Sequence, residues 1–409
     1  MDEFNFGTVR DYTKQLRSIR NWALKLRQLR PRIDTTWEEP ADWVVKDSNI
    51  HGEPARTLTI TLMPTGCEWA SLGGCTMCGE FEGSTKGDVV SPIFHVAQFA
   101  SAVSKYVPDY NPSWIRIYQE GNYINQNEIQ RSAQLTILSL ASLIYGIKRI
   151  TIESMAKYIT PRNVKDLSKS IKRDIELEIG MGFEAENEVI RNVCVNKGES
   201  LDDFSRAINL LKEEGIRTVA YVLLKPPFLS EKEAINEAIA TIQLANDIGF
   251  DAISLEPVSI HAFTLVHALN LLGLYELPWL WSVIKVAQNV QHIRDFRIGG
   301  VGFYPRPFNV AHNQHSNSDV GCNKELWDKI KEYGRTRRFE VFNNLECNCK
   351  KEWENICKTP TIPLMERIDQ QLSLLNLDSY KLATSEMQFQ TQSFVNHTTA
   401  IAGGTQYKR

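Results

Sequence analysis

The chain has 409 residues, and its 46 basic and 49 acidic side chains give a formal net charge of −3. Apolar residues make up 43% of the sequence and charged residues 23%, which excludes disordered, collagen-like and disulfide-scaffold proteins. No apolar run reaches the ~18 residues of a membrane span and no secretory signal is evident, so we expect a cytoplasmic protein without membrane contact. Cysteines in that reducing compartment more often bind metals than pair as disulfides.

The first predicted element is an amphipathic helix over residues 8–31. Residues 31–56 show turn residues and no sustained period, so residues 1–56 are expected to form an N-terminal helical extension. Six β-branched runs then alternate with helical patterns, at 57–63, 114–118, 149–152, 175–182, 217–224 and 251–257. Strands that alternate with helices indicate a parallel sheet, so residues 57–304 are predicted to form a partial (β/α)6 barrel.

Beyond about residue 305 the alternation fades. Helical patterns at 323–333 and 361–376 flank a cysteine-containing stretch at 345–358, so residues 305–380 are expected to be a helix-rich region that could bind a metal. Residues 381–409 are polar and are expected to form a loosely held tail. The predicted fold class is therefore α/β, a TIM-like partial barrel with additions at both ends.

Three cysteines share the loop that follows the first predicted barrel strand. Cys67, Cys75 and Cys78 have the spacing C-x7-C-x2-C. Iron–sulfur cubanes are held by cysteine thiolates, so three ligands would leave one iron of a [4Fe–4S] cluster open. That iron could chelate S-adenosylmethionine (SAM), and one electron would then cleave SAM to a 5′-deoxyadenosyl radical. A structural zinc loop or free thiols are the alternatives, although the next 100 residues offer zinc only His95 as a further ligand.

Polar residues follow several of the predicted strands, where barrels of this type carry their chemistry. Acceptors and hydroxyls that could hold SAM are Glu120, Gly121, Asn122, Glu153, Ser154 and Glu184. Lys225 and Glu256 could position the substrate, and His261 is a candidate for proton transfer. Singly, each is more often a loop or structural residue. Their joint placement with the cysteine loop favours one site.

The sequence resembles the archaeosine-forming radical SAM proteins (RaSEA) from about residue 56 to 357. The resemblance is carried, in order, by GCEWASLGGCTMCGE, IYQEGNYIN, IESMAKYIT, GFEAENEVIRNVCVNKG, YVLLKPPFLSEKEA, SLEPVSIHAFTLV and LPWLWSVIKV. It implies a cluster on Cys67, Cys75 and Cys78 and SAM contacts at Glu120-Gly121-Asn122. It also implies action on a lysine-adducted 7-deazaguanine in tRNA, where hydrogen abstraction breaks a C–N bond and leaves an amidine. An electron donor such as flavodoxin or ferredoxin is expected.

A second group of cysteines departs from the family pattern. Gln314 stands where the family has its first cysteine of this group, which leaves Cys322, Cys347 and Cys349, with His312 or His315 as a fourth ligand. Mixed cysteine and histidine ligation suits structural zinc, whereas three cysteines alone would suit an auxiliary iron–sulfur cluster. The remaining alternative is scattered thiols. Cys194 and Cys357 are expected to be structural.

Three hypotheses for function remain open from the sequence. The first is a tRNA-modifying radical enzyme, for which the eight basic residues among residues 1–32 could help to grip RNA, although this helix could equally dock its leucines on the barrel. The second is a radical enzyme that acts on a free amino acid or nucleoside, which the net charge of −3 favours. The third is a non-catalytic zinc protein.

Overall fold

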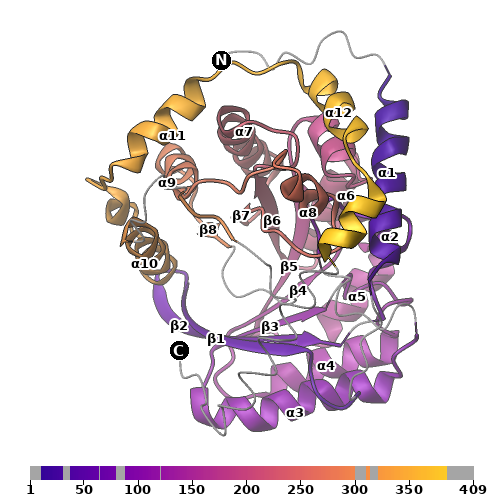
Figure 1. Cartoon of the computed structure of the whole chain (residues 1–409). Coiled ribbons are helices and arrows are strands. Elements are labelled where there is room, and N and C mark those ends of the chain that lie inside the picture. Colours follow the sequence, from indigo (N-terminus) through magenta and orange to yellow (C-terminus); the bar gives the residue numbers. More distant parts are fainter. Residues whose placement is uncertain are drawn as a thin grey trace, which may run out of the picture.

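The computed structural model describes residues 11–30, 37–63, 65–79, 88–119, 121–299, 310–313 and 321–384. Its centre is one eight-stranded sheet in which the strands follow their order in the sequence. The strands are β1 Asp42–Ile50, β2 Glu53–Leu62, β3 Trp114–Gln119, β4 Arg149–Glu153, β5 Glu176–Glu184, β6 Arg217–Leu224, β7 Ala252–Pro257 and β8 Phe296–Ile298. β1 and β2 are antiparallel, and every later neighbouring pair is parallel. The sheet therefore forms an open half-barrel (Figure 1).

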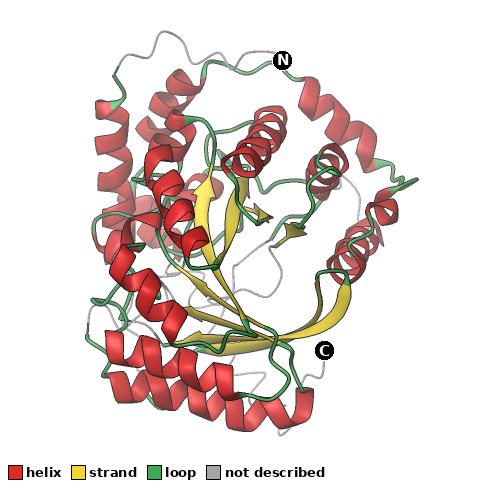
Figure 2. Cartoon of the chain, turned by 180° about the vertical axis from the view of Figure 1, so that it is seen from behind, coloured by secondary structure: helices red, strands yellow, loops and turns green. Residues whose placement is uncertain are grey.

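Helices surround this curved sheet and cover its outer face (Figures 1 and 2). They are α1 Thr13–Gln28, α2 Glu68–Ser71, α3 Pro92–Tyr110, α4 Arg131–Leu143, α5 Pro161–Lys169, α6 Leu201–Glu213, α7 Glu231–Ile248, α8 Leu265–Leu271, α9 Leu280–Asn289, α10 Gly321–Thr336, α11 Cys349–Lys358 and α12 Leu364–Ser373. Short 3₁₀ or π turns lie at Ala156–Tyr158, Ile190–Cys194 and Phe339–Phe342. α10 contacts both β1 and β8, so it bridges the two open edges of the sheet. Within the described residues, no helix is both long and apolar enough to span a membrane.

The alternation of side chains along β2 explains why the barrel keeps a polar interior. Leu58, Ile60 and Leu62 are fully buried in the apolar core between sheet and helices. Thr59 and Thr61 point the other way and line the central cavity, as successive side chains of a strand must. Closed barrels fill this space with layers of branched apolar side chains. Here the inward positions of β2 are the two threonines, and the lumen stays open.

The structure confirms the predicted α/β half-barrel, and each of the six predicted strands is present. It also contains two strands that the sequence did not predict. β1 lies in the segment expected to be an irregular extension, and its residues DWVVKDSNI mix charged and apolar side chains because it is an edge strand. β8 has only three residues and pairs with β7 alone. The two helices expected near the C-terminus are present as α10 and α12, and the cysteine-containing stretch between them holds a further helix, α11.

Candidate functional site

The cysteine loop, residues 65–79, follows β2 and lies at the mouth of the half-barrel. Cys67 precedes the short helix α2, and Cys75 and Cys78 follow it. All three thiols line the central cavity. Gly74 has φ +58°, and a Cβ there would lie 2.2 Å from Nη1 of Arg27. The backbone therefore needs glycine at this point both for its conformation and for the close approach of that side chain.

The N-terminal helix α1 supplies the arginine that holds this loop. Nη2 of Arg27 donates hydrogen bonds to the carbonyl oxygens of Cys75, at 2.6 Å, and Cys78, at 3.4 Å. Arg27 is buried, as are Ile19, Ala23 and Leu26 on the same helix. α1 therefore docks on the barrel through its apolar face, in agreement with one of the two expectations for this helix, and one of its basic residues serves the cysteine loop.

Burial controls the protonation of the loop thiols. It raises the pKa of Cys67 to about 12 and the pKa of Cys75 to about 11. Thiols with such values stay protonated at neutral pH unless a metal cation replaces the proton. The loop is therefore chemically suited to bind metal, and the buried guanidinium of Arg27 favours the thiolate form.

Glu128 organises the turn after β3, and no pattern in the sequence predicts this role. Its carboxylate accepts hydrogen bonds from the side chains of Gln119, Asn122 and Asn125 at 3.0, 2.8 and 2.9 Å. It also accepts from the backbone N–H of Glu68, at 3.0 Å, and from that of Asn122. One carboxylate thus ties the Gly121-Asn122 turn to the cysteine loop. The Asn122 amide lies 3.8 Å from the sulfur of Cys67.

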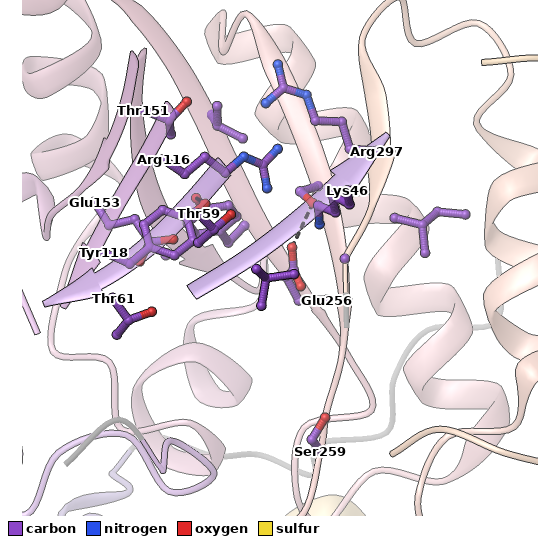
Figure 3. A pocket seen from close by; sticks show the side chains of 18 of the residues that line it. Lys46, Thr59, Thr61, Arg116, Tyr118, Thr151, Glu153, Glu256, Ser259 and Arg297 are labelled. Carbon is purple, nitrogen blue, oxygen red and sulfur yellow. Dashed lines mark hydrogen bonds between the residues drawn. The ribbon is translucent and has the colours of Figure 1, made fainter. Parts of the chain in front are cut away.

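A cavity of 1720 Å³ occupies the lumen and contacts the cysteine loop. Most of the site residues expected from the sequence line it, together with Cys67, Cys75 and Cys78; they are Gly121, Asn122, Glu153, Ser154, Glu184, Glu256 and His261. Figure 3 shows Glu153 and Glu256 pointing into this space from different strands. Glu120 lies outside the described residues.

The structure does not bring Lys225 to this cavity. Its backbone has φ +63°, and its ammonium group pairs with the carboxylate of Glu231 at 2.7 Å. Nζ also donates to the carbonyl oxygen of Leu277 at 3.4 Å. The left-handed turn after β6 sends the side chain toward α7, which explains why its position at a strand end was misleading.

The acidic groups of the cavity differ in their surroundings. Burial raises the pKa of Glu153 to about 7, and the nearby phenol groups of Tyr221 and Tyr118 oppose this effect. Burial also raises the pKa of Glu184, but the Lys197 ammonium group 3.2 Å away opposes this effect. Glu184 is thus a paired carboxylate, whereas Glu153 titrates near neutrality.

Glu256 and His261 lie on or beyond β7. Burial raises the pKa of Glu256, and its Oε1 accepts a hydrogen bond from Oγ of Ser254 at 2.7 Å. Burial lowers the pKa of His261 to about 4, so its imidazole is neutral at pH 7. A Cβ at Gly79 would lie 2.3 Å from His261 carbons, so this histidine packs directly against the end of the cysteine loop.

The C-terminal cysteines form a compact group, here called the cysteine triad. The sulfurs of Cys322, Cys347 and Cys349 all lie within 4.8 Å of one another. Cys349 is 3.6 Å from Cys322 and 3.3 Å from Cys347. Among the residues the structure describes, this is the only set of three or more candidate ligands so close together.

Neutral donors surround the triad. Nδ2 of Asn313 donates to the sulfur of Cys322 at 3.2 Å, and Nε1 of Trp281 donates to the sulfur of Cys349 at 3.3 Å. The expected ligand His312 is not part of the group, and its Nδ1 lies 2.9 Å from the carbonyl oxygen of Val310. His315 lies outside the described residues.

Comparison with known proteins agrees with the resemblance seen in the sequence. No protein-family model matches the chain. The chain is 27% identical to the archaeosine synthase subunit beta of Methanosarcina acetivorans over 83% of its length and 96% of that protein's. It is 26% identical to the subunit of the same name from Thermococcus kodakarensis over 77% and 95% of the two lengths. An uncharacterized protein of Methanocaldococcus jannaschii is 28% identical over 84% and 92%.

The similar solved structures have lower sequence identity to this chain than these relatives do. Methylornithine synthase is 9% identical, with a TM-score of 0.42 over 85% of this chain and 94% of that one. A likeness this remote supports no functional conclusion. The fold, the cysteine loop and the sequence relatives together indicate an enzyme of the class that resembles radical SAM proteins. Within that class it resembles the beta subunits of archaeosine synthase.

Proposed function

We propose that Cys67, Cys75 and Cys78 hold a [4Fe–4S] cluster at the mouth of the lumen. The observation that carries this proposal is that three partly buried cysteines of one loop line the same cavity, with the Arg27 guanidinium on the carbonyl oxygens of Cys75 and Cys78. Three thiolates can hold three irons of a cubane and leave the fourth iron open. When bound, such a cluster supplies the electron that cleaves SAM to a 5′-deoxyadenosyl radical.

The residues beside the cysteine loop are suited to bind SAM. The Asn122 side chain is fixed between Glu128 and the backbone N–H of Met155, which donates to its Oδ1 at 2.8 Å. Ser154 has a buried hydroxyl with no hydrogen-bond partner among the described residues, so it can bind a ribose hydroxyl or the amino acid end of SAM. The Glu184 carboxylate, paired with Lys197, can accept from an ammonium group. The buried position of these side chains excludes water from the reaction.

We further propose that the substrate is a lysine-adducted 7-deazaguanine in tRNA, and that hydrogen abstraction leads to cleavage of a C–N bond. Two relatives with the name archaeosine synthase subunit beta, aligned over most of both chains, support this substrate. The 1720 Å³ cavity has room for SAM and a substrate group together, because ligand pockets commonly measure ~300–1000 Å³. A flavodoxin or ferredoxin would supply the electron.

For the cysteine triad we propose a single tetrahedral ion, with zinc as the occupant. Zinc binds thiolates at ~2.3 Å in tetrahedral geometry, which places two sulfurs ~3.8 Å apart. The triad distances of 3.6 and 3.3 Å are near that value and too short for thiolates on separate irons of a cubane. N–H donors from Trp281 and Asn313 would stabilise the thiolate charge. This ion would support the C-terminal helices.

Anaerobic incubation of the reconstituted chain with SAM and dithionite tests the proposed function. The proposal expects 5′-deoxyadenosine, with more of it formed when tRNA carrying the lysine adduct is present than with the same tRNA lacking lysine. Free nucleosides and amino acids form the comparison arms. If only a free amino acid stimulates reductive SAM cleavage, the proposed tRNA substrate is wrong and the amino acid takes its place. If no substrate gives cleavage, the whole proposal is wrong.

A further inference from the structure

Two cations that face the lumen have no hydrogen-bond or ion-pair partner within the described part of the chain. Among the described residues, neither Lys46 on β1 nor Arg116 on β3 makes a hydrogen bond or an ion pair, and Nε of Arg116 is buried. The guanidinium of Arg116 lies 4.3 Å from the centroid of the Trp114 ring. Figure 3 shows both side chains pointing into the same part of the cavity. Their hydrogen-bonding capacity is therefore available to a ligand.

A neighbouring cation shows the contrasting case. Arg297 on β8 donates to both oxygens of Glu178, at 2.8 and 2.7 Å, and is fully paired. No carboxylate of the described ranges does the same for Lys46 or Arg116. Burial and, as the second cause, the positive charge of Arg116 lower the pKa of Lys46 to about 7. The two cations repel each other in the absence of an anion, so an anionic group between them would be stabilised by both.

Carboxylates with spare acceptor capacity face the same space. Oε2 of Glu256 is buried and has no hydrogen-bond partner among the described residues. Figure 3 places Glu256 beside Lys46 and across the lumen from Glu153. An anion with high charge, such as phosphate, would be repelled by these two carboxylates. A group that carries both signs would satisfy the cations and the carboxylates together.

We propose that this part of the lumen binds the α-amino acid group of the substrate, with its carboxylate on Lys46 and Arg116 and its ammonium group on Glu256. This assignment rests on the proposed function and deepens it, since a lysine attached through its side-chain nitrogen would present that group at its far end. A free amino acid carries the same chemistry. The residues thus recognise a zwitterion, and only experiment separates the two sources.

Lys46 and Arg116 lie deeper in the lumen than the cysteine loop, so two ligands could bind one above the other. Lys46 pairs in register with Thr57 and Arg116 with Thr59, whereas the cysteine loop begins after Leu62 at the end of β2. A strand rises ~3.3 Å per residue, so the backbone positions of Lys46 and Arg116 lie ~10–16 Å along the strand direction from the end of β2, where the loop begins. SAM at the loop and the zwitterion below it would leave the substrate's side-chain carbons between them, within reach of a radical formed at the loop.

Three probes test the assignment on the reconstituted full chain by isothermal titration calorimetry. L-homoarginine is a lysine whose side-chain nitrogen carries an amidinium group. 6-Guanidinohexanoic acid lacks its α-amino group, and 5-aminopentylguanidine lacks its carboxylate. We expect L-homoarginine to bind most tightly. Arg116→Gln should weaken L-homoarginine binding by about 10- to 100-fold, as for loss of a charged hydrogen bond, and leave 5-aminopentylguanidine unaffected.

Glu256→Gln should give the opposite pattern, weakening L-homoarginine and 5-aminopentylguanidine but sparing 6-guanidinohexanoic acid. A variant that merely misfolds would weaken all three probes, so the crossed pattern is specific. Arg173→Gln, at an exposed position between α5 and β5, is the matched control and should bind all probes as the parent chain does. Equal binding of the three probes, or displacement of L-homoarginine by inorganic phosphate, would overturn the assignment.

A second arm identifies the source of the zwitterion. A tRNA fragment that carries 7-deazaguanine with the lysine adduct is compared with the same RNA fragment without lysine. A lysine-dependent gain in affinity that Arg116→Gln removes supports the assignment on RNA, and L-homoarginine binding without such a gain supports it for a free amino acid. If neither probe depends on Arg116, the assignment is wrong. Formation of 5′-deoxyadenosine by the parent chain is scored separately, so failure of the radical chemistry is distinguished from failure of this site.

Discussion

The cysteine loop and the cysteine triad each use three thiols, but they place them differently. In the triad all sulfurs lie within 4.8 Å of one another among helices of the C-terminal region. Cys67, Cys75 and Cys78 instead line the large cavity at the mouth of the half-barrel. Thiols packed against helices suit a structural ion, whereas thiols on an open cavity leave room for a further ligand. The surroundings of three thiols, and not their number, therefore separate the two kinds of site.

Removing a thiol of the cysteine loop should have the largest effect on iron content and on SAM cleavage. Cys75→Ala should abolish both the iron content of the loop and the reductive cleavage of SAM, because a cubane held by two thiolates is no longer anchored. Iron, acid-labile sulfide and 5′-deoxyadenosine are measured after anaerobic reconstitution. Cys357→Ala on α11 is the control and should keep all three, and full SAM cleavage by Cys75→Ala would contradict the account.

Removing a triad thiol should affect stability and leave the cluster in place. Cys349→Ala is expected to lose the bound zinc and to lower the free energy of unfolding by more than about 4 kcal/mol, the range associated with loss of a structural metal. Metal analysis and thermal unfolding check this. Loss of iron along with zinc in Cys349→Ala would mean that the two sites are not independent.

The support of the loop by α1 gives a smaller effect. Arg27→Leu removes the hydrogen bonds to the carbonyl oxygens of Cys75 and Cys78, each worth ~1.5–3 kcal/mol for a charged donor. The cluster should still assemble but should be lost faster to an iron chelator, as followed by its visible absorbance. Arg17→Gln, exposed on the same helix, should lose its cluster at the parent rate. Equal chelation rates for both variants would show that Arg27 does not hold the loop.

The smallest effect concerns the hydrogen bond to the triad. Trp281→Phe removes the N–H donor 3.3 Å from the Cys349 sulfur, and such partners typically change metal affinity by ~10- to 100-fold. Competition with a zinc chelator should show weaker zinc binding and unchanged iron content. Tighter zinc binding by the variant would exclude this role for the indole.

The fold was largely predictable because six strands carry β-branched runs separated by helical patterns. The two missed strands lack that signal, since β1 mixes charged and apolar residues at the sheet edge and β8 has three residues. The cysteine loop could be predicted as a metal site because its candidate ligands are close together in the sequence. Arg27 and Glu128 could not be predicted as part of the site, because they reach the loop across 48 and 60 residues and only the folded chain brings them there.

Lys225 shows the opposite error. A lysine after a strand of a half-barrel was expected to face the lumen, but its left-handed backbone turns the side chain to Glu231. Backbone conformation at a single residue is not encoded in a hydrophobic pattern. By contrast, Glu153 and Glu256 line the cavity, and each alternates with buried apolar residues along its strand.

The most direct test is metal analysis with Mössbauer spectroscopy on the anaerobically purified chain. The account predicts about four irons with equivalent sulfide per chain, in the spectrum of a [4Fe–4S] cluster, together with one zinc. Cys75→Ala should then lose only the iron, and Cys349→Ala only the zinc. A chain that contains zinc at the cysteine loop and no iron or acid-labile sulfide would contradict the account.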